Sequence, residues 1–181
     1  MSRSCGSCTL CCKLLPVVEL KKLAGERCIN QRGLGCRIYR APRLPISCKL
    51  WSCQWLMDAD TINMSRPDQV HYVIDVTPDY VDARDNETGA MKRIPVLQIW
   101  VDPDYPDAHR DPALRDYLAM RGARDGVAAL VRYDSSKAVA LLPPSMVQER
   151  QFREVSDGTI DPKHDAMRAI KSITLQFASD D

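Results

Sequence analysis

Four apolar segments rich in β-branched and aromatic residues predict β-strands in the middle of the chain: 69–76, 94–102, 126–133 and 137–142. The first of them ends before Pro78, which cannot donate a backbone hydrogen bond to a neighbouring strand. Turn-forming residues at 85–89 separate the first two strands. Residues 134–136 separate the last two, which predicts a hairpin.

One helix is predicted between the second and third strands. Asp111 supplies an N-cap, and Pro112 takes the first helical position, where its missing N–H leaves no partner unsatisfied. The helix then covers 113–121 and is expected to end at Gly122, a residue type that favours helix ends. The helical spacing places three apolar residues on one side: Leu114, Tyr117 and Leu118.

Residues 1–58 lack this regular pattern. Pro and Gly interrupt them repeatedly, so the apolar residues support only a helical turn at 17–24 and a short helix at 48–57. Trp51 and Trp55 would share a face of that second helix. We expect the two rings to form a hydrophobic wall beside the cysteines.

The predicted fold class is α+β, with three regions along the chain. Residues 1–58 form a cysteine-rich metal-binding module of loops and short helices, and residues 59–145 form a β-β-α-β-β domain. Residues 146–181 form a polar tail, partly helical or disordered, with a helix expected at 162–173. The length of 181 residues is enough for a small module together with a compact domain.

All eight cysteines lie in the first region: Cys5, Cys8, Cys11, Cys12, Cys28, Cys36, Cys48 and Cys53. The N-terminus has no apolar signal segment, and no apolar run is long enough to cross a bilayer. We therefore expect a cytoplasmic protein with reduced thiols and no membrane contact. Under those conditions closely spaced cysteines favour metal binding over disulfides.

The spacing of the first cysteines excludes a straight helix wrapped on one metal ion. In an α-helix Cys5 and Cys11 would lie ~9 Å apart along the axis. Tetrahedral zinc, with Zn–S bonds of ~2.3 Å, needs sulfur atoms only ~3.8 Å apart. The segment must therefore wind as a loop, serve separate sites, or hold a polynuclear centre.

Three arrangements of the thiolates remain open. Cys5 and Cys8 could form a zinc knuckle that two later cysteines complete. Cys5, Cys8 and Cys11 could hold a [4Fe–4S] cluster with a remote cysteine as fourth ligand. The eight thiolates could also form two sites. Soft sulfur ligands favour zinc, iron–sulfur or copper(I) centres over magnesium or calcium.

The complete cysteine pattern resembles a known family. Cys5-x2-Cys8-x2-Cys11-Cys12 is followed by Cys28, by Gly35-Cys36-Arg37-Ile38-Tyr39, by Pro45-x2-Cys48 and by Cys53. This is similar to the CxxCxxCC cysteine-cluster family (YkgJ-like), described as zinc- or iron-chelating, and a similar module occurs in flagellin lysine N-methylases. The likeness covers about residues 5–57 and implies that the cysteines chelate metal. It departs from the family pattern in the loop between Cys36 and Cys48.

Among the eight cysteines we rank Cys5, Cys8 and Cys11 first as ligands. Cys36, Cys48 and Cys53 follow, whereas Cys12 and Cys28 are spare or belong to a second site. Side chains from the same region are expected to surround the centre. Trp51, Trp55, Ile38 and Tyr39 would pack around it, and Arg37 and Lys49 would donate to the sulfurs.

The net charge of +1 hides an uneven distribution. Residues 1–58 carry ten Lys or Arg against three acidic residues, a net charge of +7, and the remainder carries −6. A basic module can bind nucleic acid. Cations beside thiolates are explained by the charge of the thiolates themselves, so we expect a metal ion as ligand and regard nucleic acid as disfavoured.

No catalytic motif is recognised, so whether the chain is an enzyme stays open. His71 and His109 have no partner at metal-binding spacing and are expected to be structural or solvated. The expected function is a metal-chelating protein that binds zinc or an iron centre. The alternatives are an iron–sulfur protein in electron transfer or protein lysine methylation, and a zinc-stabilised module that binds nucleic acid or protein.

Overall fold

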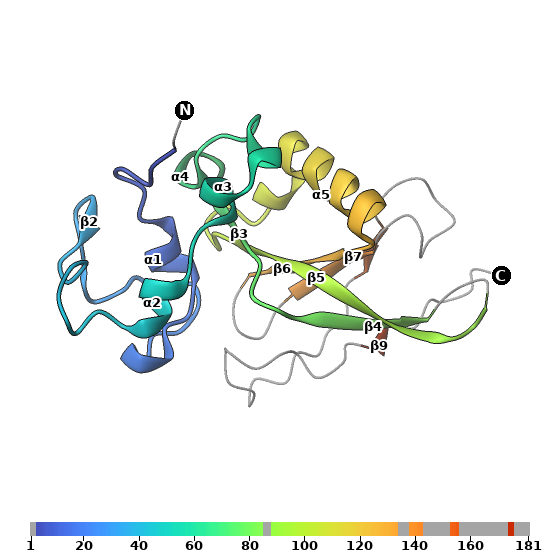
Figure 1. Ribbon diagram of the computed structural model, residues 1–181, viewed down its shortest axis with the longest axis horizontal. Helices are drawn as coiled ribbons and strands as arrows, with labels where there is room; N and C mark the ends of the chain where they lie inside the picture. The colour runs from blue at the N-terminus through green and yellow to red at the C-terminus, as the bar shows by residue number, and fades with distance from the viewer. Residues whose placement is uncertain (1–2, 85–87, 134–137, 143–152, 156–173, 176–181) are drawn as a thin grey trace.

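The computed structural model of the chain describes residues 3–84, 88–133, 138–142, 153–155 and 174–175 (Figure 1). It combines helices with a mostly antiparallel sheet, which confirms a mixed α and β fold. Much of the predicted tail, including the helix expected at 162–173, lies outside the described residues. The same holds for the hairpin turn expected at 134–136.

The central strand of the sheet is β5 (Met91–Val101). Along one edge it pairs antiparallel with two shorter strands, and along the other edge it pairs parallel with β6. The further strands extend the sheet in the order β8-β7-β6-β5-β4-β9. Their bounds are β3 (Tyr72–Asp75), β4 (Tyr80–Arg84), β6 (Ala128–Arg132), β7 (Ala138–Leu142), β8 (Arg153–Val155) and β9 (Thr174–Leu175).

Two sequence predictions in the sheet need correction. The first predicted strand begins at Tyr72 rather than at residue 69, because Pro67 starts a helical turn, α4 (Pro67–Val70). Strand β4 was not predicted, although its Val81 is completely buried. Only Tyr80 and Val81 in it are strong strand formers, so the alternating pattern is too short to be recognised.

Helix α5 (Pro112–Asp125) connects the parallel strands β5 and β6 and covers one face of the sheet. The carboxylate of Asp111 accepts a hydrogen bond from the Ala113 N–H, which confirms the predicted N-cap. The predicted stop at Gly122 is wrong. Gly122 is buried inside the helix, and the helix ends at Gly126, whose left-handed φ of 66° suits glycine.

The N-terminal region consists of short elements joined by loops. It contains α1 (Leu10–Leu14), a 3₁₀ turn (Val18–Leu20), β1 (Gln31–Arg32), β2 (Gly35–Cys36), α2 (Ile46–Leu50), α3 (Gln54–Met57) and a second 3₁₀ turn (Ala59–Thr61). The single helix predicted at 48–57 is therefore wrong. An extended stretch at Trp51–Cys53 divides it into α2 and α3.

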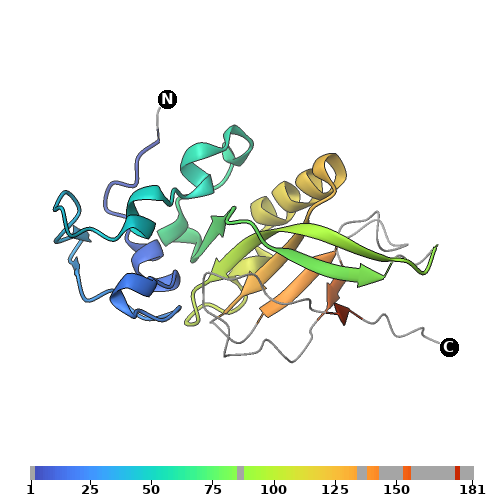
Figure 2. The ribbon, with the colours of Figure 1, turned by 60° about the horizontal axis from the view of Figure 1, so that its bottom comes forward.

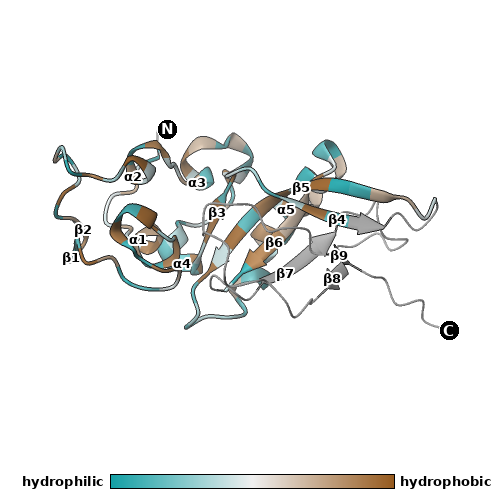
Figure 3. Cartoon of the chain, turned by 90° about the horizontal axis from the view of Figure 1, so that it is seen from below, coloured by the Kyte–Doolittle hydropathy of each residue, from teal (hydrophilic) through white to brown (hydrophobic). Residues whose placement is uncertain are grey.

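This region packs directly against the sheet. Leu10 and Leu14 of α1 form one buried cluster with Val73 of β3 and Trp100 of β5. Figure 2 shows the short N-terminal elements at the end of the sheet where β3 lies. Figure 3 shows apolar residues along α1, β5 and β6, the elements that supply the two cores. The cysteine region and the sheet therefore share a hydrophobic cluster.

Candidate metal centre

Four cysteines line one small pocket between the N-terminal segment and the start of the sheet. They are Cys5, Cys8, Cys11 and Cys53. The rest of the wall comes from Trp51, Trp55, Leu56, Arg66, Pro67 and Val73. The cavity volume is about 30 Å³, far below the ~300 Å³ at which pockets for organic ligands begin. Its size and sulfur-rich wall suit an inorganic centre.

The first three thiols reach this pocket because the chain turns before it becomes helical. The Cys8 N–H donates to the Cys5 carbonyl over 2.8 Å, and Gly6 between them has a left-handed φ of 52°. Helix α1 then begins at Leu10, so Cys11 stands in its first turn. The segment is thus a loop followed by a helix, one of the arrangements that the spacing argument left open.

The fourth thiol comes from the extended stretch between α2 and α3. Cys53 is buried, with 6% of its surface exposed, and its φ and ψ of −64° and 132° are those of extended backbone. Because the helix breaks there, Cys53 and Trp51 both reach the pocket. A continuous helix would have placed residues 51 and 53 about 200° apart around its axis.

Two indole rings form part of the pocket wall, in agreement with the prediction for Trp51 and Trp55. The Trp51 Nε1–H donates to the Asp75 carboxylate over 2.9 Å, and the Trp55 Nε1–H donates to the Met64 carbonyl over 3.0 Å. These bonds fix both rings to residues outside the cysteine segment. Apolar walls of this kind exclude water from a metal centre.

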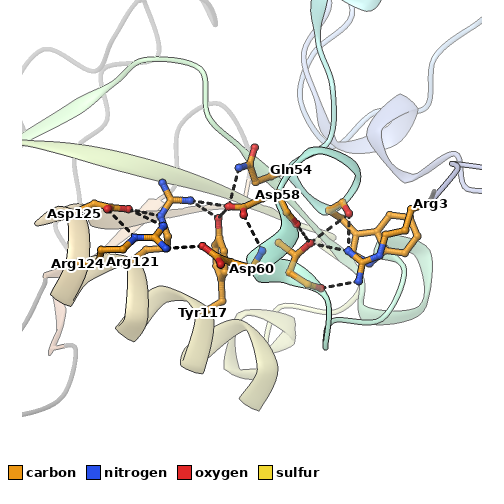
Figure 4. Close-up of polar contacts among 10 residues, drawn as sticks. Arg3, Gln54, Asp58, Asp60, Tyr117, Arg121, Arg124 and Asp125 are labelled. Atoms are coloured by element: carbon orange, nitrogen blue, oxygen red, sulfur yellow. Dashed lines mark hydrogen bonds and ion pairs between the residues drawn. The ribbon is translucent and has the colours of Figure 1, made fainter. Parts of the chain in front are cut away.

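The segments that carry Cys5 and Cys53 are joined by Arg3 (Figure 4). Its guanidinium donates to the Trp55 carbonyl and to the Thr61 hydroxyl, each over 2.7 Å. It also donates to the carbonyls of Thr61 and Ile62, over 2.8 and 2.9 Å. Arg3 therefore fixes the chain two residues before Cys5 against the chain two residues after Cys53.

Two cations that the sequence analysis did not single out lie close to cysteines: Arg66 at the pocket wall and Lys22 near Cys12 and Cys28. Arg66 lines the pocket, pairs with Asp68 over 2.6 Å and donates to the Ser7 hydroxyl over 3.2 Å. Lys22 is buried and donates to the carbonyls of Lys13, Leu15 and Leu23. Arg66 could not be recognised from the sequence as a neighbour of the cysteines, because it lies 13 residues beyond Cys53.

Three sequence predictions about the surroundings of the centre are not supported by the contacts. Lys49 directs its Nζ to the Pro42 carbonyl at 3.5 Å, and Arg37 is exposed. Tyr39 is 68% exposed, whereas Ile38 is 3% exposed and belongs to the interior. The side chains of Arg37, Tyr39 and Lys49 are all exposed, the first two just after β2 and the third on α2.

The other four cysteines lie outside the pocket. The Cys28 N–H donates to the Cys12 carbonyl over 2.9 Å, so these two backbones are adjacent. Cys36 belongs to β2, and Cys48 is exposed on α2. Of the three later cysteines ranked as ligands, the structure brings Cys53 to the pocket wall, where Cys36 and Cys48 do not appear.

The free thiols of the pocket are protonated at neutral pH. Burial raises the pKa of Cys53 to about 11 and also raises the pKa values of Cys5 and Cys8. The pKa of Cys11 is raised by its hydrogen bond with Cys12 and by burial. The same bond, together with the charge of Lys22, lowers the pKa of Cys12 to about 7. A metal that binds the pocket thiols must therefore displace their protons.

The donor set fits a soft metal centre in chemistry, because all four candidate ligands at the pocket are thiols. Among the residues that the structure describes, no group of three His, Cys, Asp or Glu side chains is close enough to hold a single ion. A mononuclear zinc site needs its sulfur atoms ~3.8 Å apart. In a cubane cluster each thiolate binds a different iron, so the ligands stand farther apart.

The histidines have structural surroundings, as predicted. His71 has a left-handed φ of 64° and stacks on Tyr105 with 3.5 Å between ring centroids. His109 is buried, and its Nδ1 lies 3.0 Å from the Pro106 carbonyl and 3.3 Å from the Tyr133 hydroxyl. Neither lines the cysteine pocket.

Comparisons with family models, with curated proteins and with solved structures found no match to this chain. The likeness to the cysteine-cluster family therefore rests on the spacing of the cysteines and on the Ile38-Tyr39 pair that follows Cys36. Within the described residues, no helix combines the length and apolar character that a membrane span requires.

Proposed function

We propose that this chain is an iron–sulfur protein in which Cys5, Cys8, Cys11 and Cys53 hold one [4Fe–4S] cluster that exchanges single electrons with a partner. The observation that carries the proposal is the pocket lined by these four thiols. Three come from a C-x2-C-x2-C segment and the fourth from a remote position, which is the ligand pattern of many such clusters. When bound, the cluster would supply a reversible one-electron couple.

Two features favour a cluster over a single zinc ion. Four thiols line one pocket, and the four irons of a cubane cluster each bind one thiolate. The wall between them is apolar, with Trp51, Trp55 and Val73 at its surface. Burial is one of the factors that set the potential of an iron–sulfur centre, and this wall would provide it.

Electron transfer suits the pocket better than a reaction on an organic substrate. The cluster itself would occupy the cavity of about 30 Å³ between the thiols, which leaves no room beside it for a methyl donor or a lysine side chain. Cys5 is exposed, so one edge of the site reaches the protein surface. An exposed edge permits electrons to pass to another protein without entry of a substrate.

The proposal is tested by anaerobic purification followed by absorption spectroscopy and analysis of iron and sulfide. We expect absorption near ~400 nm and about four iron and four sulfide per chain. The matched pair of variants is Cys53→Ser, inside the pocket, and Cys36→Ser, outside it. The first should lose the absorption, and the second should keep it.

A colourless protein with one or two zinc ions per chain would overturn the cluster proposal. Equal loss of iron in Cys53→Ser and Cys36→Ser would contradict the assigned ligand set. Paramagnetic resonance after reduction supplies the last check, because a one-electron carrier must give a signal that disappears on reoxidation.

A further inference from the structure

We infer that residues 18–50 carry a docking surface for an acidic protein partner. None of the residues 18–50 lines the pocket, so the inference goes beyond the proposed function. The exposed side chains of this segment are called the distal surface below. Figures 1 and 2 place this segment, which runs from α1 to α2, at the end of the molecule opposite to β9.

The first observation is an unusual amount of exposed apolar surface. Six large apolar side chains of this segment are between 59% and 79% exposed: Leu23, Ile29, Leu34, Tyr39, Ile46 and Leu50. Single exposed apolar residues are ordinary in soluble proteins. Six within 28 residues cost solvation free energy unless another surface covers them.

The second observation is a set of unpaired cations between these apolar residues. Five arginines of the segment are exposed: Arg27, Arg32, Arg37, Arg40 and Arg43. In the described part of the chain none of them forms an ion pair, whereas Arg66, Arg121, Arg124 and Arg132 all do. The segment contains two acidic residues, Glu19 and Glu26. Its eight Lys and Arg residues therefore exceed its acidic residues by six.

Of the two acidic residues, Glu19 connects two parts of the segment through hydrogen bonds. Its carboxylate accepts hydrogen bonds from the Ser47 N–H over 3.0 Å and from the Ser47 hydroxyl over 2.8 Å. This joins the 3₁₀ turn at Val18–Leu20 to the first turn of α2, next to the exposed Ile46. These bonds hold two separate parts of the segment in a fixed relation, and each of them carries exposed apolar residues, Val18 and Ile46.

The chemistry of the distal surface specifies the partner. Arginine binds carboxylates through two parallel hydrogen bonds and is enriched at protein interfaces. A partner with Asp or Glu beside Leu, Ile or Phe would neutralise the arginines and cover the apolar side chains together. A nucleic acid would leave Ile29, Leu34 and Leu50 without apolar contacts, and Tyr39 alone offers an aromatic ring for stacking. Membrane insertion normally uses a longer amphipathic helix than the five residues of α2.

The test begins with a random dodecapeptide phage library selected against the full chain with its native metal content. The proposal expects enriched peptides that carry at least two acidic and two large apolar residues. A synthetic copy of the strongest peptide is then titrated against the protein at low and high salt. Binding should weaken at least tenfold from ~50 to ~300 mM salt, since exposed charges are screened.

Two variants of the surface locate the binding, and one variant elsewhere serves as control. Arg40→Glu combined with Arg43→Glu should weaken peptide binding at least tenfold. Leu34→Ser combined with Leu50→Ser should do the same while the charge is unchanged. Met120→Ser combined with Arg110→Glu changes exposed residues on and beside α5 and should leave the affinity unchanged. Metal content and circular dichroism confirm that each variant is folded.

Several results would overturn the inference. Absence of acidic peptides among those enriched would do so, as would equal affinity of the peptide for the surface variants and the wild type. Preferential binding to phosphatidylglycerol vesicles or to a 20-nucleotide RNA would assign the surface to another ligand. Concentration-dependent dimerisation abolished by Arg40→Glu and Arg43→Glu would identify a second copy of the chain as the partner. None of these readouts depends on which metal the cysteines hold.

Discussion

The guanidinium carbon of Arg3 lies 4.5 Å from the centroid of the Trp55 ring, while its nitrogens donate to the carbonyl of that same residue over 2.7 Å. A cation on an aromatic face and a hydrogen bond to the backbone both hold Trp55 in place. Trp55 is part of the pocket wall, and Cys53, two residues earlier in the chain, supplies a thiol. Arg3 is therefore a positioning residue for the proposed centre.

Arg3→Gln is expected to weaken retention of the metal about 10- to 100-fold, the range typical of residues that orient metal ligands. Gln cannot reach all four acceptors, so the segment before Cys5 would lose its fixed position. Arg3→Lys keeps the positive charge but loses the forked set of guanidinium donors. Its metal retention should therefore lie between that of Arg3→Gln and that of the wild type. Loss of iron to a chelator measures the effect. Arg110→Gln, which changes an exposed arginine that does not line the pocket, is the control.

An unchanged rate of metal loss in Arg3→Gln would contradict this role, even if the variant were less stable. A purely structural contribution would lower the midpoint of unfolding by urea without changing metal retention in the folded protein. The two measurements therefore separate positioning from general stability.

Arg66 is expected to affect the electronic properties of the centre. It lines the pocket, and its pairing with Asp68 and the hydrogen bond to Ser7 keep the guanidinium near the thiols. A positive charge favours the more negative, reduced state of a cluster. Arg66→Gln should therefore make the reduction potential more negative. Arg66→Lys keeps the positive charge, so its reduction potential should stay close to that of the wild type. Redox titration of the absorption band tests this, and identical potentials would contradict it.

The sequence predicted the parts of the structure that depend on local chemistry. The Asp111 cap, the start of the helix at Pro112 and the strand at 94–102 follow from residue types that are adjacent in the chain. The end of the helix was wrong because Gly122 fits against the sheet, a property of packing that no local pattern records. Gly126 carries the required left-handed conformation instead.

The site was predictable in composition and less so in geometry. Spacing identified Cys5, Cys8 and Cys11, which share the pocket. Spacing could not identify the fourth thiol among Cys36, Cys48 and Cys53. Cys53 reaches the pocket because the chain is extended between α2 and α3, and the sequence did not predict this break. The cations were predicted from proximity in sequence to the cysteines, whereas those that lie close to cysteines in the structure, Arg66 and Lys22, are placed by tertiary contacts.

The ion pair between Arg132 and Asp79 is expected to be important for the stability of the sheet. Their side chains are 9% and 2% exposed, and the nitrogen and oxygen atoms lie 2.9 Å apart. Arg132 also donates to Gln98 over 2.6 Å. Removal of one partner leaves a buried charge uncompensated, so Asp79→Asn should destabilise the fold by about 3–5 kcal/mol.

Urea unfolding measures this change, and a second variant isolates its cause. Arg132→Met combined with Asp79→Leu removes both charges and should be clearly more stable than Asp79→Asn alone. If Asp79→Asn cost less than about 1 kcal/mol, the pair would be solvated in solution, and the argument from burial would fail.

Asp58 is expected to make the stability of the fold depend on pH at the acidic end. Burial favours the protonated form of its carboxyl, but hydrogen bonds from Asp60, Gln54 and Tyr117 and the charge of Arg121 lower its pKa below the ordinary value (Figure 4). The Arg121 contact is 2.9 Å long, and the Tyr117 hydroxyl donates over 2.9 Å. The carboxylate thereby joins the segment after Cys53 to α5.

Because the pKa is lowered in the folded state, the stabilisation is complete above the unfolded value of about 3.9 and is lost as the pH falls through the folded pKa. Asp58→Asn should therefore be about 1–3 kcal/mol less stable than wild type at pH 7, the usual value for hydrogen bonds to a charged group. The difference should shrink progressively below about pH 4. Asp107→Asn, which removes an exposed carboxylate 3.4 Å from Arg110, should change stability by less than about 1 kcal/mol at pH 7. A difference between wild type and Asp58→Asn that stayed constant from pH 7 to pH 2.5 would show that the ionised carboxylate is not the stabilising form.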